Sequence, residues 1–408
     1  CYRKVQLAEK EREMKLTEET PFFFIYSVWT KNGEYREQVK RLVTDYDNYI
    51  SLKLAGDDAY LSEKMVGYPA ELDEVYAESF EEQKKEWFSC VGDGIQECRN
   101  TWEHKKWNIT DFPEFELAIT IDRPELYYDF LQKDWTRFCH DYWKNNFLEH
   151  HTLSKKRVTR IYIGNQFCHN LFPKKKLLFQ VLEKALENNL AVTLAFSYIR
   201  NHLLEEIDEL LQELEVWCQS REKEAGKEQE EIIVNDWAMP ILLQGKPHLK
   251  PVLGVLLNKR RKDVRLPYKH GIGNHVDSLA ENNLNCGFYQ DYLKNTFDIQ
   301  RFEFESCGYK VTIPDGHHSL HLPFFQTNTS QYCTLYAVCR YGDRGKQKLP
   351  ENCPKYCEQK VFLYPKHLKM VGRYNSLFGY DGKILWDEKQ LQDYLEQGID
   401  RIVVNVSL

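Results

Sequence analysis

Short apolar runs alternate with amphipathic segments along the last two thirds of the chain. A short apolar run bounded by turn residues predicts a buried strand, and apolar positions three and four residues apart predict a helix. The predicted strands cover residues 160–164, 190–198, 232–235, 252–257, 301–305, 319–323, 360–363 and 401–406, and the predicted helices cover 173–188, 203–226, 276–297 and 388–397. Strands that alternate with helices favour parallel pairing. The length of this region indicates an α/β fold, a TIM-like (β/α) barrel over residues 156–408.

The first 155 residues have a different pattern, which predicts a smaller α+β domain in front of the barrel. Helical spacing covers residues 4–19, 33–54, 71–107 and 124–150, with Asp122 as the expected N-cap of the last helix, and strand patterns cover 21–29 and 115–121. The basic run at 153–157 is the expected domain boundary. The role of this domain is open, and binding of a partner protein or peptide is one expectation.

Composition and charge limit the class of protein. The formal net charge of −7 removes the general attraction to phosphate, so nucleic acid is not indicated as a partner. No apolar run approaches the roughly 20 residues that cross a bilayer, so we expect no membrane span and a cytoplasmic location.

The chain contains twelve cysteines, which are not expected to form disulfides in a reducing compartment and instead suggest metal binding. Three residues separate Cys353 from Cys357, and thirteen separate Cys339 from Cys353, with Cys339 just after an apparent strand at 332–338. Cys168 follows the first predicted barrel strand, and a barrel brings its loops together. Four thiolates bind Zn²⁺ as well as a [4Fe–4S] cluster, so both remain open, and buried inert cysteines are the alternative.

Several segments together resemble a known family. They are residues 161–164 with Cys168, residues 234–237, residues 253–259 and residues 263–265. They look like the collagenase-like peptidase family U thirty-two, and most closely like its iron–sulfur proteins of oxygen-independent ubiquinone hydroxylation. The resemblance implies a [4Fe–4S] cluster on Cys168, Cys339, Cys353 and Cys357, an unidentified electron donor, and a hetero-oligomer with a related barrel protein.

Polar residues at the ends of predicted strands are the candidate catalytic or substrate-binding groups. Asn235, Asp236, Asn258 and Lys259 have this position and can either contact a substrate in the barrel mouth or cap the following helices. Glu303 lies on a late strand and is a candidate general base.

Two neighbouring features belong to the same region. Glu305 shares a strand face with Glu303, and such buried carboxylates need a cationic partner such as Lys259. His321 lies in the next predicted strand, where it either faces the site or is an ordinary histidine.

Three functions follow from these observations. The first is an enzyme, or enzyme component, in which an iron–sulfur cluster supports oxygen-independent hydroxylation or a related redox modification. The second is a peptidase or peptide-processing protein of the same family. The third is a binding protein in which the cluster has a structural role.

Overall fold

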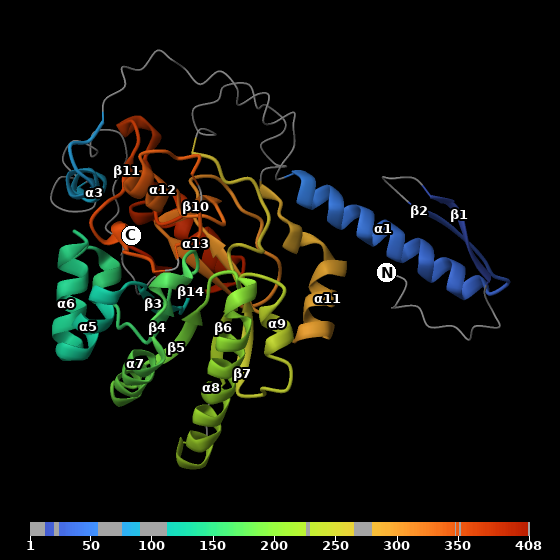
Figure 1. Ribbon diagram of the computed structural model, residues 1–408, viewed down its shortest axis with the longest axis horizontal. Coiled ribbons are helices and arrows are strands. Elements are labelled where there is room, and N and C mark those ends of the chain that lie inside the picture. Colours follow the sequence, from blue (N-terminus) through green and yellow to red (C-terminus); the bar gives the residue numbers. More distant parts are fainter. Residues whose placement is uncertain are drawn as a thin grey trace.

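The computed structural model describes residues 13–19, 24–55, 76–89, 112–225, 229–264, 280–346, 348–350 and 352–406. A nearly closed barrel of eight parallel strands lies at its centre, with helices around the outside (Figure 1). The predicted α/β class and TIM-like barrel are therefore confirmed.

The barrel strands follow one another around the sheet in chain order. Their bounds are β3 Glu116–Ile121, β4 Arg160–Gly164, β5 Ala191–Ala195, β6 Glu230–Val234, β7 Leu249–Leu253, β8 Glu303–Glu305, β9 His318–Leu322 and β14 Ile399–Val404. All neighbouring strands in this series pair in parallel, and a parallel bridge from Leu253 to Phe302 links β7 to the start of β8. The loops that follow the strands therefore share one face, the barrel mouth.

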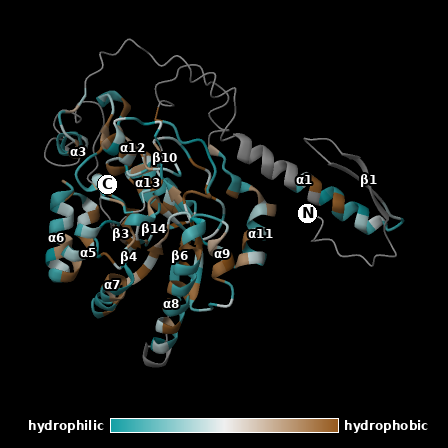
Figure 2. Ribbon diagram, in the orientation of Figure 1, coloured by the Kyte–Doolittle hydropathy of each residue, from teal (hydrophilic) through white to brown (hydrophobic). Residues whose placement is uncertain are grey.

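Helices connect the barrel strands and cover the outer surface. They are α5 Pro124–Gln132, α6 Trp135–Asn145, α7 Lys175–Glu187, α8 Leu204–Ala225, α9 Met239–Leu242, α11 Gly287–Phe297 and α13 Glu388–Glu396. The helix predicted over 124–150 is divided in two, because the Asp134 carboxylate accepts a hydrogen bond from the Arg137 N–H and starts α6. Figure 2 shows hydrophilic and hydrophobic residues together on these helices, as expected for helices with one buried face.

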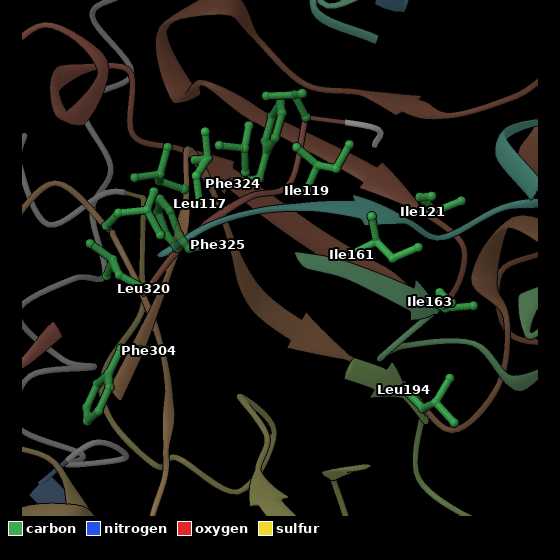
Figure 3. Close-up of a cluster of buried hydrophobic side chains, with 14 of the residues drawn as sticks. Leu117, Ile119, Ile121, Ile161, Ile163, Leu194, Phe304, Leu320, Phe324 and Phe325 are labelled. Atoms are coloured by element: carbon green, nitrogen blue, oxygen red, sulfur yellow. The ribbon is translucent and has the colours of Figure 1, made fainter. Parts of the chain in front are cut away.

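The main hydrophobic core lies between the strands and the helices, because successive strand side chains point to opposite faces. Leu117, Ile119 and Ile121 of β3 are fully buried in it, beside side chains of β4, β5, β8 and β9 (Figure 3). The intervening positions point into the barrel. They form a second, smaller cluster of Ala118, Tyr162, Ala195, Ile233, Val252 and Val403.

A second sheet is inserted between β9 and β14. It contains β10 Phe324–Thr329, β13 Ser376–Tyr380, β12 Met370–Arg373 and β11 Phe362–Leu363, paired antiparallel in that order. The strand predicted at 360–363 belongs to this sheet and not to the barrel. Helix α12, Thr334–Tyr341, follows β10. The residues of this insertion bring three cysteines to the barrel mouth, as described below.

The N-terminal elements differ from the prediction. β1 Glu13–Glu19 and β2 Phe24–Trp29 form an antiparallel hairpin, followed by α1 Gly33–Ala55, and α3 covers Phe80–Ser89. Figure 1 shows the hairpin and α1 extending away from the barrel, with α1 contacting α11. The helix predicted over 4–19 is wrong where it is described, since strand pairing with β2 outweighs the helix propensity of β1. The rest of that prediction lies outside the described residues.

The barrel begins earlier in the chain than the predicted boundary at residue 155. β3 lies between β14 and β4 in the eight-stranded sheet, so residues from Glu116 onward belong to the barrel. The predicted separate α+β domain over residues 1–155 is therefore not confirmed. Among the described residues, every helix is too short or too polar to span a lipid bilayer.

Candidate functional site

Four cysteines from three separated segments line one cavity beside the barrel mouth. They are Cys168 in the loop after β4, Cys333 at the start of α12, and Cys353 and Cys357 in the loop before β11. The cavity encloses about 500 Å³, part of it open to solvent. We call it the thiol cavity. The sequence motif predicted three of these cysteines to lie together, and the structure adds Cys333.

Local hydrogen bonds hold two of the thiols in place. The Asn165 side-chain oxygen accepts from the N–H groups of Phe167 and Cys168, both at 2.9 Å, and fixes the loop after β4. The Cys333 Sγ atom caps α12 by accepting from the Tyr336 N–H at 3.3 Å. The backbone therefore presents the sulfur atoms to the cavity in a defined arrangement.

Burial raises the pKa of three of these thiols and favours their protonated form. Burial raises the pKa of Cys168 to about 12 and that of Cys357 to about 12, with the neighbouring thiols adding to the shift. Burial raises the pKa of Cys333 to about 11, and Cys353 adds to it. Grouped thiolates repel one another in a poorly solvated cavity, so a cation beside the sulfur atoms would favour their ionisation.

Cys339 is placed differently from the prediction. The apparent strand at 332–338 is the helix α12, capped by Cys333 at its start and by left-handed Gly342 at its end. A short apolar run is compatible with either structure, and the caps decide for a helix. Cys339 lies in the last turns of α12, half-buried, and is not among the residues that line the thiol cavity.

The thiol cavity offers a donor set of four cysteine thiols, which is the ligand type of both zinc sites and iron–sulfur clusters. No group of three or more His, Cys, Asp or Glu side chains in the described part of the chain is arranged to hold a metal ion. A cluster spreads its thiolate ligands over different iron atoms, so its cysteines lie farther apart than those around a single zinc ion. The four thiols line one cavity, and the choice between the two groups belongs to metal analysis.

A second cavity occupies the barrel mouth and encloses about 480 Å³, partly open to solvent. Residues at or just after the carboxyl ends of the strands line it, among them Asp122 after β3, Asn165 after β4 and Asn405 after β14. Tyr162 and His321 reach it from inside the barrel. This is the position at which barrel enzymes place their chemistry.

A chain of buried polar groups lies beneath this cavity. The His321 Nε2 atom is 2.5 Å from a carboxylate oxygen of Glu303, and the Tyr162 hydroxyl donates to the other oxygen at 3.1 Å. Arg401 in turn donates to the Tyr162 oxygen at 3.2 Å. A carboxylate that accepts from a histidine fixes its tautomer, so Glu303 orients His321 for proton transfer. Glu303, predicted as a general base, does not line the cavity itself but contacts His321 and Tyr162, which do.

The neighbouring carboxylate, Glu305, also lines the cavity and has a cationic partner. This partner is Lys262, which forms a buried ion pair with it, and not the expected Lys259. The side chain of Lys259 is exposed, and its backbone N–H donates to the Asn283 side chain. Lys259 lines neither cavity.

The other predicted polar residues hold loops in place. Asn235 donates to the Phe196 carbonyl at 2.8 Å and accepts from the Leu256 N–H at 3.1 Å, which ties three strand ends together. The Asp236 carboxylate accepts from N–H groups at the start of α9. Asn258 donates to the Glu303 carbonyl at 3.2 Å. None of the three lines either cavity, so the structure favours the capping alternative for them.

The two cavities are neighbours. Asn165 and Phe167 line the barrel mouth, whereas Cys168, next in the chain, lines the thiol cavity. The rings of Phe167 and Phe378 meet edge to face with centroids 4.9 Å apart. The loop after β4 therefore contributes to both. Sequence patterns could not identify Cys333 or Tyr162, since only the folded chain brings them to these cavities.

No protein-family model matches this chain, and no curated protein or solved structure shows significant similarity to it. The resemblance to peptidase family U thirty-two therefore stays a prediction based on the sequence motifs.

Proposed function

We propose that this protein is a redox enzyme, or a component of one, whose thiol cavity holds a [4Fe–4S] cluster beside a substrate site in the barrel mouth. The observation that carries the proposal is the convergence of four cysteines from three segments on one cavity. The proposed reaction class is oxygen-independent hydroxylation or a related redox modification, as the sequence resemblance implies.

Three of the proposed ligands belong to the sequence motif and also line the thiol cavity: Cys168, Cys353 and Cys357. The fourth is Cys333, because it lines the cavity and its Sγ atom is already held by the start of α12. The sequence motif predicts Cys339 instead, and single variants distinguish the two.

When bound, such a cluster supplies one-electron transfer at a potential that thiolate ligation, hydrogen bonds and burial determine. The protein's own residues position the reaction. Asn165 holds the loop that carries Cys168, and Phe167 in the same loop forms part of the barrel mouth. His321, oriented by Glu303, is placed to accept or return a proton at a molecule bound there.

The test is anaerobic purification followed by iron, sulfide and zinc analysis, with absorption and paramagnetic resonance spectra. The variants are C353A, C333A and C339A, and the control is C139A, because Cys139 lies on α6 and does not line the cavity. Circular dichroism establishes that each variant folds.

About four irons and four sulfides per chain in the wild type and C139A, lost in C353A and C333A, would support the proposal. Loss in C339A with retention in C333A would restore the ligand set that the motif predicts. Stoichiometric zinc, or no metal and an unchanged fold in C353A, would refute the redox function and favour a structural or peptide-binding protein.

A further inference from the structure

We propose that the surface around the thiol cavity is the docking site of an electron-carrier protein with an acidic surface. This inference rests on the proposed function and deepens it by naming the class of protein that supplies the electrons. It is drawn from the local charge, from the exposed aromatic side chains and from the position of both beside the cavity.

The surface belongs to one short part of the chain, residues 332–360. This segment contributes three of the four cavity cysteines, and α12 lies beside the loop before β11 (Figure 1). Tyr336, Pro350 and Tyr356 of the same segment also line the cavity. We call the exposed side chains of residues 332–360 the basic rim. A protein that covers the basic rim would therefore lie beside the thiol cavity.

The charge of the basic rim is opposite to that of the whole chain. Residues 332–360 contain six arginines and lysines and three acidic residues, whereas the whole chain contains 55 and 62. The exposed basic side chains include Arg340, Lys346, Lys348 and Lys360. Complementary charge steers a partner to one face of a protein and orients it there, so the basic rim favours a protein with an acidic surface.

Aromatic side chains lead from the cavity to the exposed surface. The ring centroids of Tyr356 and Tyr336 are 6.2 Å apart, and those of Tyr336 and Tyr341 are 6.0 Å apart. Tyr341 is 39% exposed, and the side chain of Leu349 in the following loop is 44% exposed. Protein interfaces have tyrosines and apolar side chains at their centre and charged residues around them. The basic rim combines both kinds of residue.

An electron carrier is the acidic partner that matches this position. Redox partners form small, transient interfaces, which a surface of this extent can supply. One electron would pass from the reduced carrier to the cluster in the thiol cavity, so the carrier is oxidised and the cluster is reduced, with no bond made or broken. Nucleic acid also carries negative charge, but the net charge of −7 opposes binding to a long phosphate backbone.

Three probes test the inference: a plant-type ferredoxin is a small acidic electron carrier, cytochrome c is a basic one, and single-stranded oligouridylate represents nucleic acid. Binding is measured anaerobically by calorimetry at low and at high salt, and electron transfer from reduced ferredoxin is followed by stopped-flow absorption. The iron content of each preparation is determined in parallel, and circular dichroism establishes that each variant folds.

The test variant is K346E/K348E, which reverses two charges of the basic rim. The matched control is K144E/K389E, which makes the same change of net charge on α6 and α13. Lys144 and Lys389 are exposed and do not line the thiol cavity.

We expect K346E/K348E to weaken ferredoxin binding about tenfold or more at low salt and to slow electron transfer, while K144E/K389E has a smaller effect. High salt should reduce this difference, and binding of cytochrome c should not be weakened by K346E/K348E.

Three results would overturn the inference: no ferredoxin binding, equal effects of the two double variants, or tighter binding of oligouridylate than of ferredoxin. Any of these in a protein that contains iron would leave the proposed redox function standing. Ferredoxin binding that depends on Lys346 and Lys348 in a protein without iron would refute only that function.

Discussion

The glutamate in the barrel interior, Glu231, allows the most exacting test of the structure. Its carboxylate accepts two hydrogen bonds from Arg401 at 2.6 and 3.1 Å, one from Thr193 at 2.8 Å and one from Arg160 at 3.4 Å. The variant E231Q keeps the shape of the side chain and removes its charge. The buried Arg401 and the half-buried Arg160 then lose part of their charge compensation, which is the costly way to break a buried ion pair.

The magnitude follows from the pKa of Glu231. Burial alone would raise this pKa, but Arg160 and Arg401 outweigh burial and lower it to about 2. The difference from the ordinary value of 4.5 corresponds to about 3 kcal/mol at neutral pH. Removal of one partner from a buried pair costs about 3–5 kcal/mol in other proteins, which agrees with this value.

The pH dependence gives a second test. Because the pKa of Glu231 is lower in the folded state, its contribution is complete above the unfolded value near 4.5 and is lost as pH falls to about 2. We expect E231Q to unfold at lower urea concentration at pH 7 and to lose less stability than the wild type between pH 5 and pH 2. The control is E213Q, since Glu213 forms an exposed pair with Lys175 that contributes little. Equal stability of E231Q and E213Q at pH 7 would refute the reasoning.

Three further predictions concern packing, capping and the histidine of the barrel mouth. G254A should destabilise the protein by about 1–3 kcal/mol in urea unfolding, because its Cβ would lie 2.1 Å from the Asn235 side-chain oxygen, which is itself hydrogen-bonded. An unchanged midpoint would show that this strand end is not packed as described. D134A should cost about 1 kcal/mol by losing the α6 cap, measured in the same way, and no loss would contradict the cap assignment. E303Q should change the tautomer balance of His321 in nitrogen NMR spectra, and identical spectra would exclude Glu303 as its partner.

The barrel could be predicted from the sequence because its strands are buried on both faces. Such strands appear as short apolar runs, and runs such as 160–164 and 401–406 coincide closely with β4 and β14. The alternation with helices then determined the class of fold. The first barrel strand was recognised as a strand but assigned to another domain, because no local pattern shows which sheet a strand joins.

The errors share a physical cause. The segment 13–19 has helix-prone charged residues, and only its pairing with β2 makes it a strand. The segment 332–338 has an apolar run that fits either structure, and only the caps at Cys333 and Gly342 identify α12. The cysteine spacing predicts a cluster of thiols that includes Cys339. In the structure the thiol cavity is lined by Cys333, at the start of α12, and not by Cys339.

The two ends of the barrel interior differ in how their polar groups are paired, and this difference favours the carboxyl end as the candidate site. At the amino ends of the strands, the carboxylates of Glu116 and Glu231 accept hydrogen bonds from Arg160 and Arg401. The charged side chains at that end of the interior are therefore paired with one another. At the carboxyl ends, polar side chains such as Asn165, His321 and Asn405 line a cavity. Paired buried charges contribute to structure, whereas polar side chains that line a cavity can contact a bound molecule. The loop after β4 contributes to both cavities, so a molecule bound in the barrel mouth would lie beside the thiol cavity, as the proposed redox function requires.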